Sequence, residues 1–300
     1  MALELKEHEP LPDGLRRIFV ELFDSALSEV DSPKPSQRTQ AVHESRKRLK
    51  ELRATLRLLR PALGDKWFGD ENSRLRDLGQ PLSAVRDAQV MVDALAKLKD
   101  HFKPELAKNA FAPLRKILER RRLDTVHHTL EQQDTLRDSA QGLAAAKARL
   151  DDWPLDDANW DCIITGITRV YRQGRSAMSV ALDSCEDLAF HEWRKRAKDL
   201  RYQLTILHPI WPATIEALRA EAHELGDQLG DDHDLAVLAD LIDTDLHDSI
   251  PKPDRQALLA LVARRRQTLQ KHAKQLGARL YAEKPKHFHR RMQAYAEALS

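Results

Sequence analysis

The strongest constraint on this fold is a basic motif that the chain contains twice. Residues 43–53 read HESRKRLKELR and residues 191–201 read HEWRKRAKDLR, at an offset of 148 residues. Eight of the eleven positions are identical, and a ninth exchanges Glu51 for Asp199. Similarity by chance between two helices would give scattered Leu and Ala matches, whereas these matches share His, Arg and Lys.

Two further matches follow in the same order. LGQPLSAVRD at 78–87 corresponds to LGDQLGDDHD at 225–234, and RRRLDTVHH at 120–128 corresponds to RRRQTLQKH at 264–272. Three matches at nearly constant offset indicate one structural unit used twice. We predict two tandem four-helix bundles, residues 1–150 and 151–300, with a linker at Asp151–Asp157.

The composition predicts that these units are all-α. The chain contains only 10 glycines and 5% aromatic residues, and it shows no strand-like alternation of useful length. Prolines separate stretches with helical periodicity. One predicted helix covers about Thr214–Asp245 with a break near Gly230, and a long helical run extends from Pro113 to about Leu150.

Each copy of the basic motif predicts a helix with a stripe of cations on one face. At about 100° per residue, the polar positions fall within roughly a third of the circumference, over about 21 Å of axis, and leucines occupy the opposite side. The first stripe comprises His43, Arg46, Lys47, Lys50, Arg53 and Arg57. The second comprises His191, Arg194, Lys195, Lys198, Arg201 and Tyr202. Like charges at this spacing destabilise a helix, so two copies in one register predict an anion-binding surface. A solvated basic face is the alternative.

Further polar residues interrupt apolar helix faces. Buried charge is costly unless it is paired, so we expect these residues to point inward toward a partner. They are Arg121, His128, Arg265, His272 and Arg175. Asp87 and Asp234 precede apolar stretches, and we interpret them as helix N-caps or as carboxylates that orient basic side chains, with a structural role favoured.

Composition limits the class of protein. The chain has 300 residues with 49 Lys+Arg and 47 Asp+Glu, a net charge of +2, so bulk charge indicates no partner. No apolar run approaches a membrane span of about 20 residues, and the N-terminus lacks an apolar signal core. We therefore expect a cytoplasmic protein without membrane contact. Cys162 and Cys185 lack metal spacing and are expected to fill the core.

The predicted helix H-E-x-R-K-R-x-K-x-L-R occurs twice, and an RD or HD pair begins the next helical segment. In these features the chain resembles the CHAD domain, the conserved histidine α-helical domain. The resemblance covers about Asp13 to Tyr295. It implies two four-helix bundles related by pseudo-twofold symmetry, with a basic cleft or pore between them that binds inorganic polyphosphate, and association with polyphosphate granules. The first copy departs from the pattern, because Ala54 stands where the second has Tyr202. Family members often accompany a triphosphate-hydrolysing CYTH domain, for which this chain is too short.

We therefore expect a non-catalytic polyphosphate-binding protein that needs no cofactor or metal. A general polyanion or nucleic-acid binder is the first alternative, although a stripe with one aromatic residue suits base stacking poorly. A metal-dependent phosphohydrolase is less favoured, because Lys47 and Lys195 stand where a zinc helix needs its second His. The third alternative is a helical adaptor protein, whose charges would be scattered over its surface.

Overall fold

Helices make up the whole architecture. The computed structural model describes residues 3–6, 8–31 and 33–299, so Met1, Ala2 and Ser300 at the ends of the predicted halves lie outside it. The helices are α1 (Leu11–Val30), α2 (Arg38–Leu58), α3 (Arg60–Leu63), α4 (Asp65–Gly79), α5 (Ser83–His101), α6 (Ala112–Val126), α7 (Thr135–Ala148), α8 (Trp160–Ser184), α9 (Asp187–Ile206), α10 (Pro212–Asp243), α11 (Lys252–Leu280) and α12 (Pro285–Leu299). The described residues contain no strand, and the all-α prediction is confirmed.

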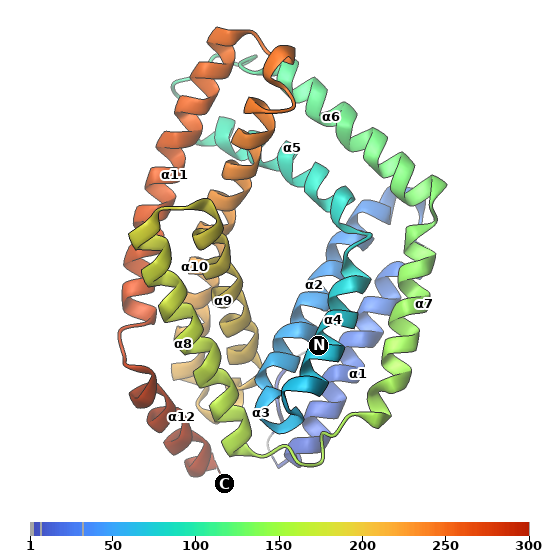
Figure 1. The fold of residues 1–300 in the computed structure, drawn as a ribbon, viewed down its shortest axis with the longest axis vertical. Helices are drawn as coiled ribbons and strands as arrows, with labels where there is room; N and C mark the ends of the chain where they lie inside the picture. Colours follow the sequence, from blue (N-terminus) through green and yellow to red (C-terminus); the bar gives the residue numbers. More distant parts are fainter. Residues whose placement is uncertain (1–2, 7, 32, 300) are drawn as a thin grey trace.

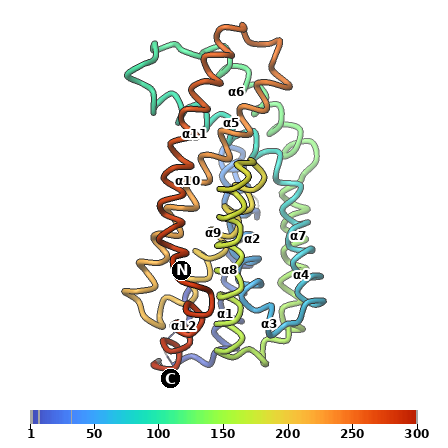
Figure 2. The backbone as a smooth tube through the Cα atoms, turned by 60° about the vertical axis from the view of Figure 1, so that its left-hand side comes forward, coloured from blue at the N-terminus to red at the C-terminus, as the bar shows by residue number. Residues whose placement is uncertain are grey.

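The helices form two columns that meet at one end and are bridged at the other. Figure 1 shows α1–α4 and α7 in one column and α8–α12 in the other, with α2 and α9 converging at the lower end. At the upper end, α5 crosses to α10 and α11, and α6 packs on α5. Figure 2 shows the same long α10–α11 pair extending past α8 and α9 to reach the bridge. None of the described helices is both long and apolar enough to cross a bilayer.

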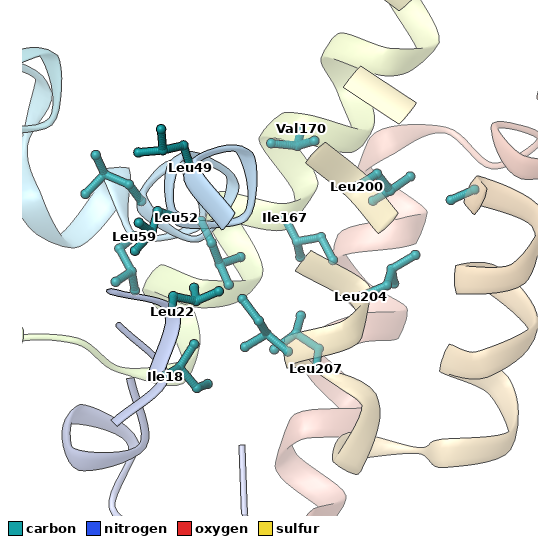
Figure 3. Packing of buried hydrophobic residues seen from close by; sticks show 14 of the residues in the cluster. Ile18, Leu22, Leu49, Leu52, Leu59, Ile167, Val170, Leu200, Leu204 and Leu207 are labelled. Atoms are coloured by element: carbon teal, nitrogen blue, oxygen red, sulfur yellow. The ribbon is translucent and has the colours of Figure 1, made fainter. Parts of the chain in front are cut away.

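The larger apolar core joins the two columns at the lower end. Figure 3 shows Leu52 of α2, Ile167 of α8 and Leu204 of α9 in this core, and each is at most 1% exposed. Residues from both halves of the chain contribute to it. Burial of such side chains contributes roughly 1.5–3 kcal/mol each, which stabilises the junction between the columns.

A second core lies in the upper bridge. Leu95 of α5 and Leu114 of α6 pack in the same cluster as Leu238 of α10 and Leu258 of α11. Both cores therefore contain residues from before and after residue 150. The boundary between the two cores in space does not coincide with the boundary between the two copies of the repeat in sequence. The two tandem bundles and their boundary remain predictions.

The repeated LG motif behaves differently in its two copies. In the first copy, α4 ends at Gly79 and α5 begins at Ser83, with Pro81 between them. Proline lacks the N–H that would continue the helical ladder. The second copy has Gln228 at the corresponding position, and α10 continues without interruption. The predicted break near Gly230 is therefore wrong.

Two other local predictions are also wrong. The expected run from Pro113 to Leu150 is divided, because a π-helical turn over His127–Gln132 and a left-handed Asp134 (φ 48°) separate α6 from α7. Cys185 was expected to fill the core but is exposed, and it ends α8 in a left-handed conformation with φ 57°.

One glycine sets the approach of the columns. A Cβ at Gly166 of α8 would lie 1.9 Å from the carbonyl oxygen of Leu58 at the end of α2. That separation is far below van der Waals contact, so only glycine permits this packing. The result is that α8 lies directly against the α2–α3 junction.

Candidate anion-binding cleft

A cleft of about 610 Å³ opens between α2 and α9, with α5 and α10 completing its walls. Its lining contains eleven Arg and Lys side chains and three aspartates, in a chain whose net charge is only +2. The eleven are Arg46, Lys47, Lys50, Arg53, Arg57, Arg86, Arg194, Lys195, Arg196, Lys198 and Arg201. Unbalanced positive charge is therefore concentrated in the cleft, whose lining holds eight more cations than carboxylates.

The amphipathic motif helices aim their cations into this cleft. On α2, Leu49 and Leu52 are at most 4% exposed and pack in the lower core, and Ala197 and Leu200 of α9 do the same. Because the apolar face of each helix is buried, the polar face must point into the space between the columns. All twelve residues of the two predicted stripes line the cleft.

Contacts between α2 and α9 lie at the lower end of the cleft. Arg57 Nη1 donates to Asp199 Oδ1 at 3.2 Å, and the buried Gln203 donates from Nε2 to the carbonyl oxygen of Ala54 at 3.0 Å. Asp199 also accepts from Arg196 Nη1 at 3.0 Å. The carboxylate thus joins one arginine from each column.

Several cleft arginines are held by partners that neutralise them incompletely. Arg46 Nη1 donates to the carbonyl oxygen of Gly79 at 2.7 Å, and Arg53 Nε donates to the amide oxygen of Asn72 at 3.0 Å. Arg194 Nη2 lies 3.9 Å from Asp234 Oδ1. Burial and the neighbouring Arg57 lower the pKa of Arg53 to about 10. Neutral oxygens position these guanidinium groups and leave their charge available to an anion.

Two of the four cleft lysines, Lys47 and Lys195, form ion pairs with Glu44 and Glu192, whereas Lys50 and Lys198 do not. No carboxylate of the described residues lies within ion-pair distance of either ammonium group. The side chain of Lys50 is exposed in the cleft. Partial burial among the cleft walls, followed by the charges of Lys198, Arg46, Arg194 and Arg86, lowers its pKa to about 7. Burial and Arg194 lower the pKa of Lys198 to about 8. A bound anion would relieve this repulsion.

The cleft histidines are neutral at neutral pH. The rings of His191 and His233 lie with centroids 4.3 Å apart. Burial and mutual repulsion lower the pKa of His191 to about 4, and burial and Arg194 do the same for His233. Burial and Arg86 also lower the pKa of His43. Neutral imidazoles can donate one hydrogen bond each without adding charge.

The aspartates of the second motif are not helix caps. Asp87 lies inside α5 and Asp234 lies inside α10, and both line the cleft. The N-cap interpretation is therefore wrong, and the alternative, carboxylates beside basic side chains, fits their positions. Burial raises the pKa of Asp234 against the opposing effect of Arg194. Among the residues the structure describes, no three His, Cys, Asp or Glu side chains form a metal-holding group.

Sequence reasoning missed residues next to these aspartates. Arg86 and His233 stand at corresponding places in the RD and HD pairs, and both line the cleft. The first residue of each pair, and not only its aspartate, was therefore a candidate that the sequence offered. Val90, Met91 and Val237 add an apolar section of wall from α5 and α10, and Val90 and Val237 occupy equivalent positions of the repeat.

Two glycines of the second motif bring α10 close to the basic helix. A Cβ at Gly226 would lie 3.4 Å from Lys198 Cγ, and one at Gly230 would lie 3.5 Å from Arg194 Nε. The bare backbone of α10 therefore forms a surface on which these two side chains rest. Both side chains line the cleft.

Five predicted site residues do not line the cleft. Arg121 contacts Asp245 Oδ2 at 3.3 Å on the surface, and His128 is exposed beside Gln132. His272 is exposed, since Leu269 and Ala273 carry the buried face of α11. The inward orientation expected for these three residues is wrong, because their helices bury narrower faces than the periodicity indicated.

The other two serve different sites. Arg265 lines a neighbouring cavity of about 280 Å³ between α5, α10 and α11. Arg175 Nη1 donates to the carbonyl oxygen of Glu283 at 2.8 Å and contacts the carbonyl oxygen of Tyr281. Carbonyl groups at a helix end lack partners within the helix. Arg175 therefore supplies hydrogen-bond donors to carbonyl groups just after α11, and it does not line the cleft.

Comparisons with known proteins agree with this architecture. The sequence model of the CHAD domain family matches residues 21–243. A crystal structure of the CHAD domain from the plant Ricinus communis superposes with a TM-score of 0.63 at 19% identity, covering 95% of this chain and 96% of that one. No curated protein matches the sequence.

Proposed function

This chain belongs to the CHAD domain family, and on that premise we propose that it binds inorganic polyphosphate in the cleft without hydrolysing it. The observation that carries the proposal is the concentration of eleven Arg and Lys against three Asp in one cleft. A helical adaptor would have no reason to assemble like charges that raise the free energy of its own fold.

The chemistry of polyphosphate suits such a receptor. Each internal phosphate carries about one charge and offers no base or sugar, so an extended double row of cations is the matching surface. Arginines offer two parallel hydrogen bonds, and lysines act as point charges. Tyr202 is the one aromatic side chain other than histidine in the described lining, which disfavours a function based on stacking nucleic-acid bases.

We include two finer statements in the proposal. The absence of hydrolysis is supported by the setting of the cleft carboxylates, since Asp199 is bound by two arginines and Asp234 lies beside Arg194. A carboxylate whose oxygens are occupied by arginine N–H groups is not free to accept a proton from an attacking water. Incubation of the protein with polyphosphate should therefore release no free phosphate. Binding of long chains would also give the protein an affinity for polyphosphate granules.

The decisive experiment is a competition titration at two salt concentrations. Long-chain polyphosphate, single-stranded RNA and duplex DNA are offered at equal phosphate concentration. We expect tight, salt-sensitive preference for polyphosphate, and loss of most of that affinity in the double variant Lys50→Glu/Lys198→Glu. Because two cations are reversed, the slope of log affinity against log salt should fall by about 2.

The control is Lys116→Glu/Lys274→Glu, which makes the same charge change at two exposed lysines of α6 and α11 outside the cleft. It should bind as the unmodified protein does. Equal affinity for all three polymers would reduce the function to general polyanion binding. Equal loss in both double variants would show that net charge rather than the cleft determines binding.

A further inference from the structure

The cationic stripe of α2 does not end at the cleft. Arg60 follows Arg53 and Arg57 at helical spacing, so the three fall within about 60° of one another around the axis. The backbone keeps this register past the end of α2, because Leu59 has helical angles and its carbonyl accepts from the N–H of Leu63 at 3.0 Å. Arg60 therefore extends the stripe beyond the contact between α2 and α9.

On α8, two arginines adjoin this extension. The close approach at Gly166 brings α8 against the α2–α3 junction, and Arg169 and Arg172 lie one and two turns further along. Arg169 is half-buried and Arg172 is exposed. Burial, followed by the positive charge of Arg60, lowers the pKa of Arg169, so these guanidinium groups act on one another.

Neutralisation of this group is incomplete. Asp65 Oδ1 accepts from Arg60 Nε at 2.6 Å. In the described part of the chain, no carboxylate lies within ion-pair distance of Arg169 or Arg172. Three cations thus share one nearby carboxylate on an accessible surface.

Two comparable regions, the end of the second motif helix and the neighbouring upper cavity, do not have this excess of cations. In the second copy, the positions equivalent to Arg57 and Arg60 are Thr205 and His208, and His208 Nδ1 lies 3.2 Å from Glu4 Oε2. The neighbouring upper cavity balances three cations with three carboxylates. Its charged lining consists of Arg86, Lys97, Arg265, Asp93, Asp231 and Asp234.

We propose that Arg60, Arg169 and Arg172 form an exit segment, a second binding site that holds the part of a polyphosphate chain emerging from the cleft. The inference rests on the proposed function and adds a preference for chain length. A short oligophosphate that fits inside the cleft does not reach the exit segment, whereas a long chain contacts both sites. The second contact is intramolecular once the first is made, so it raises the overall affinity for long chains.

The test compares Arg169→Gln/Arg172→Gln with the full-length unmodified protein, using tripolyphosphate and long-chain polyphosphate as probes. Substitutions at such positions leave the fold intact, and circular dichroism with thermal melting verifies this. We expect several-fold weaker binding of the long chain, and a decrease of about 1–2 in the slope of log affinity against log salt. Binding of tripolyphosphate should be unchanged. The matched control is Arg115→Gln/Arg290→Gln, which removes two exposed arginines of α6 and α12 and should change neither affinity.

Three results would overturn the inference. Unchanged binding of both probes would show that the exit segment makes no contact, and equal weakening of both would show that the arginines act through the cleft. Equal weakening in the control variant would reduce the effect to net charge. Absence of polyphosphate binding by the unmodified protein would instead reject the proposed function, and the inference with it.

Discussion

The two basic helices share a sequence but differ in how their surroundings neutralise them. In the first copy, burial, followed by the charges of Lys198, Arg46, Arg194 and Arg86, lowers the pKa of Lys50 to about 7, and no carboxylate is among the main influences on it. In the second copy, burial and Arg194 lower the pKa of Lys198 to about 8, and the carboxylates of Asp227 and Asp234 oppose this fall. The duplicated motif therefore determines where the cations stand, while the neighbouring helices determine how much unbalanced charge each copy offers to a ligand.

The copies also differ in how their first helices pack. Gly166 of α8 corresponds to Ile18 of α1 at the offset of 148 residues, and both are fully buried. Ile18 fills the lower core with its side chain, whereas Gly166 admits the carbonyl oxygen of Leu58. At this position of the repeat, a large side chain fills the core in one copy, whereas in the other the missing side chain lets two backbones come close together.

The largest effect that tests this comparison is on stability. Gly166→Ala should lower the free energy of unfolding by an amount near the upper end of the about 1–3 kcal/mol typical of an overpacked core, because the clash is with backbone and cannot relax by rotation of a side chain. Chemical denaturation monitored by circular dichroism measures it. Gly69→Ala in α4, where a Cβ meets no atom within 4 Å, is the matched control and should not destabilise. A neutral Gly166→Ala would mean that α8 can move away from α2 at little cost.

An intermediate effect separates the two lysines. Lys50→Glu should weaken polyphosphate binding at least about tenfold, a change of about 1.4 kcal/mol, and Lys198→Glu should weaken it less, because carboxylates already offset part of its charge. Isothermal titration of each single variant at fixed salt makes the measurement. Equal losses would show that the two copies contribute equally and that the difference in neighbours does not affect binding.

The smallest effect is the dependence on pH. Because their pKa values are lowered to about 7 and about 8, both lysines should lose charge as the pH rises from 6 to 9, so affinity for polyphosphate should fall over this range. Lys50→Arg should flatten the lower part of this profile, and Lys198→Arg the upper part. Titrations at constant ionic strength test both expectations.

Stability should respond to pH in the opposite direction. Above pH 7 the unfolded chain keeps lysine protons that the folded protein has lost, so the unfolded state binds more protons and the unliganded protein becomes more stable as the pH rises. A decline in both stability and binding over this range would indicate general loss of structure instead of titration of the two lysines.

Much of the cleft was predictable because the repeat carried chemistry as well as periodicity. All six positions of each stripe line it, from His43 and His191 to Arg57 and Tyr202. Prediction failed where one helix had to be placed against another. Arg121, His128 and His272 lie on faces that periodicity alone assigned to the interior, and Arg175 binds the end of a helix that follows it by more than a hundred residues.

The sequence by itself determined an all-α chain, a duplicated unit and two cationic stripes, since these depend on local periodicity and on the identity of repeated residues. Only the tertiary structure decided that the stripes face each other, that Arg86 and His233 join them, and that α10 continues where α4 and α5 are separate. It also decided that both cores combine the two halves of the chain. These outcomes depend on contacts between residues far apart in sequence, such as Gly166 with Leu58 and Arg57 with Asp199, and a local pattern contains no information about its distant partner.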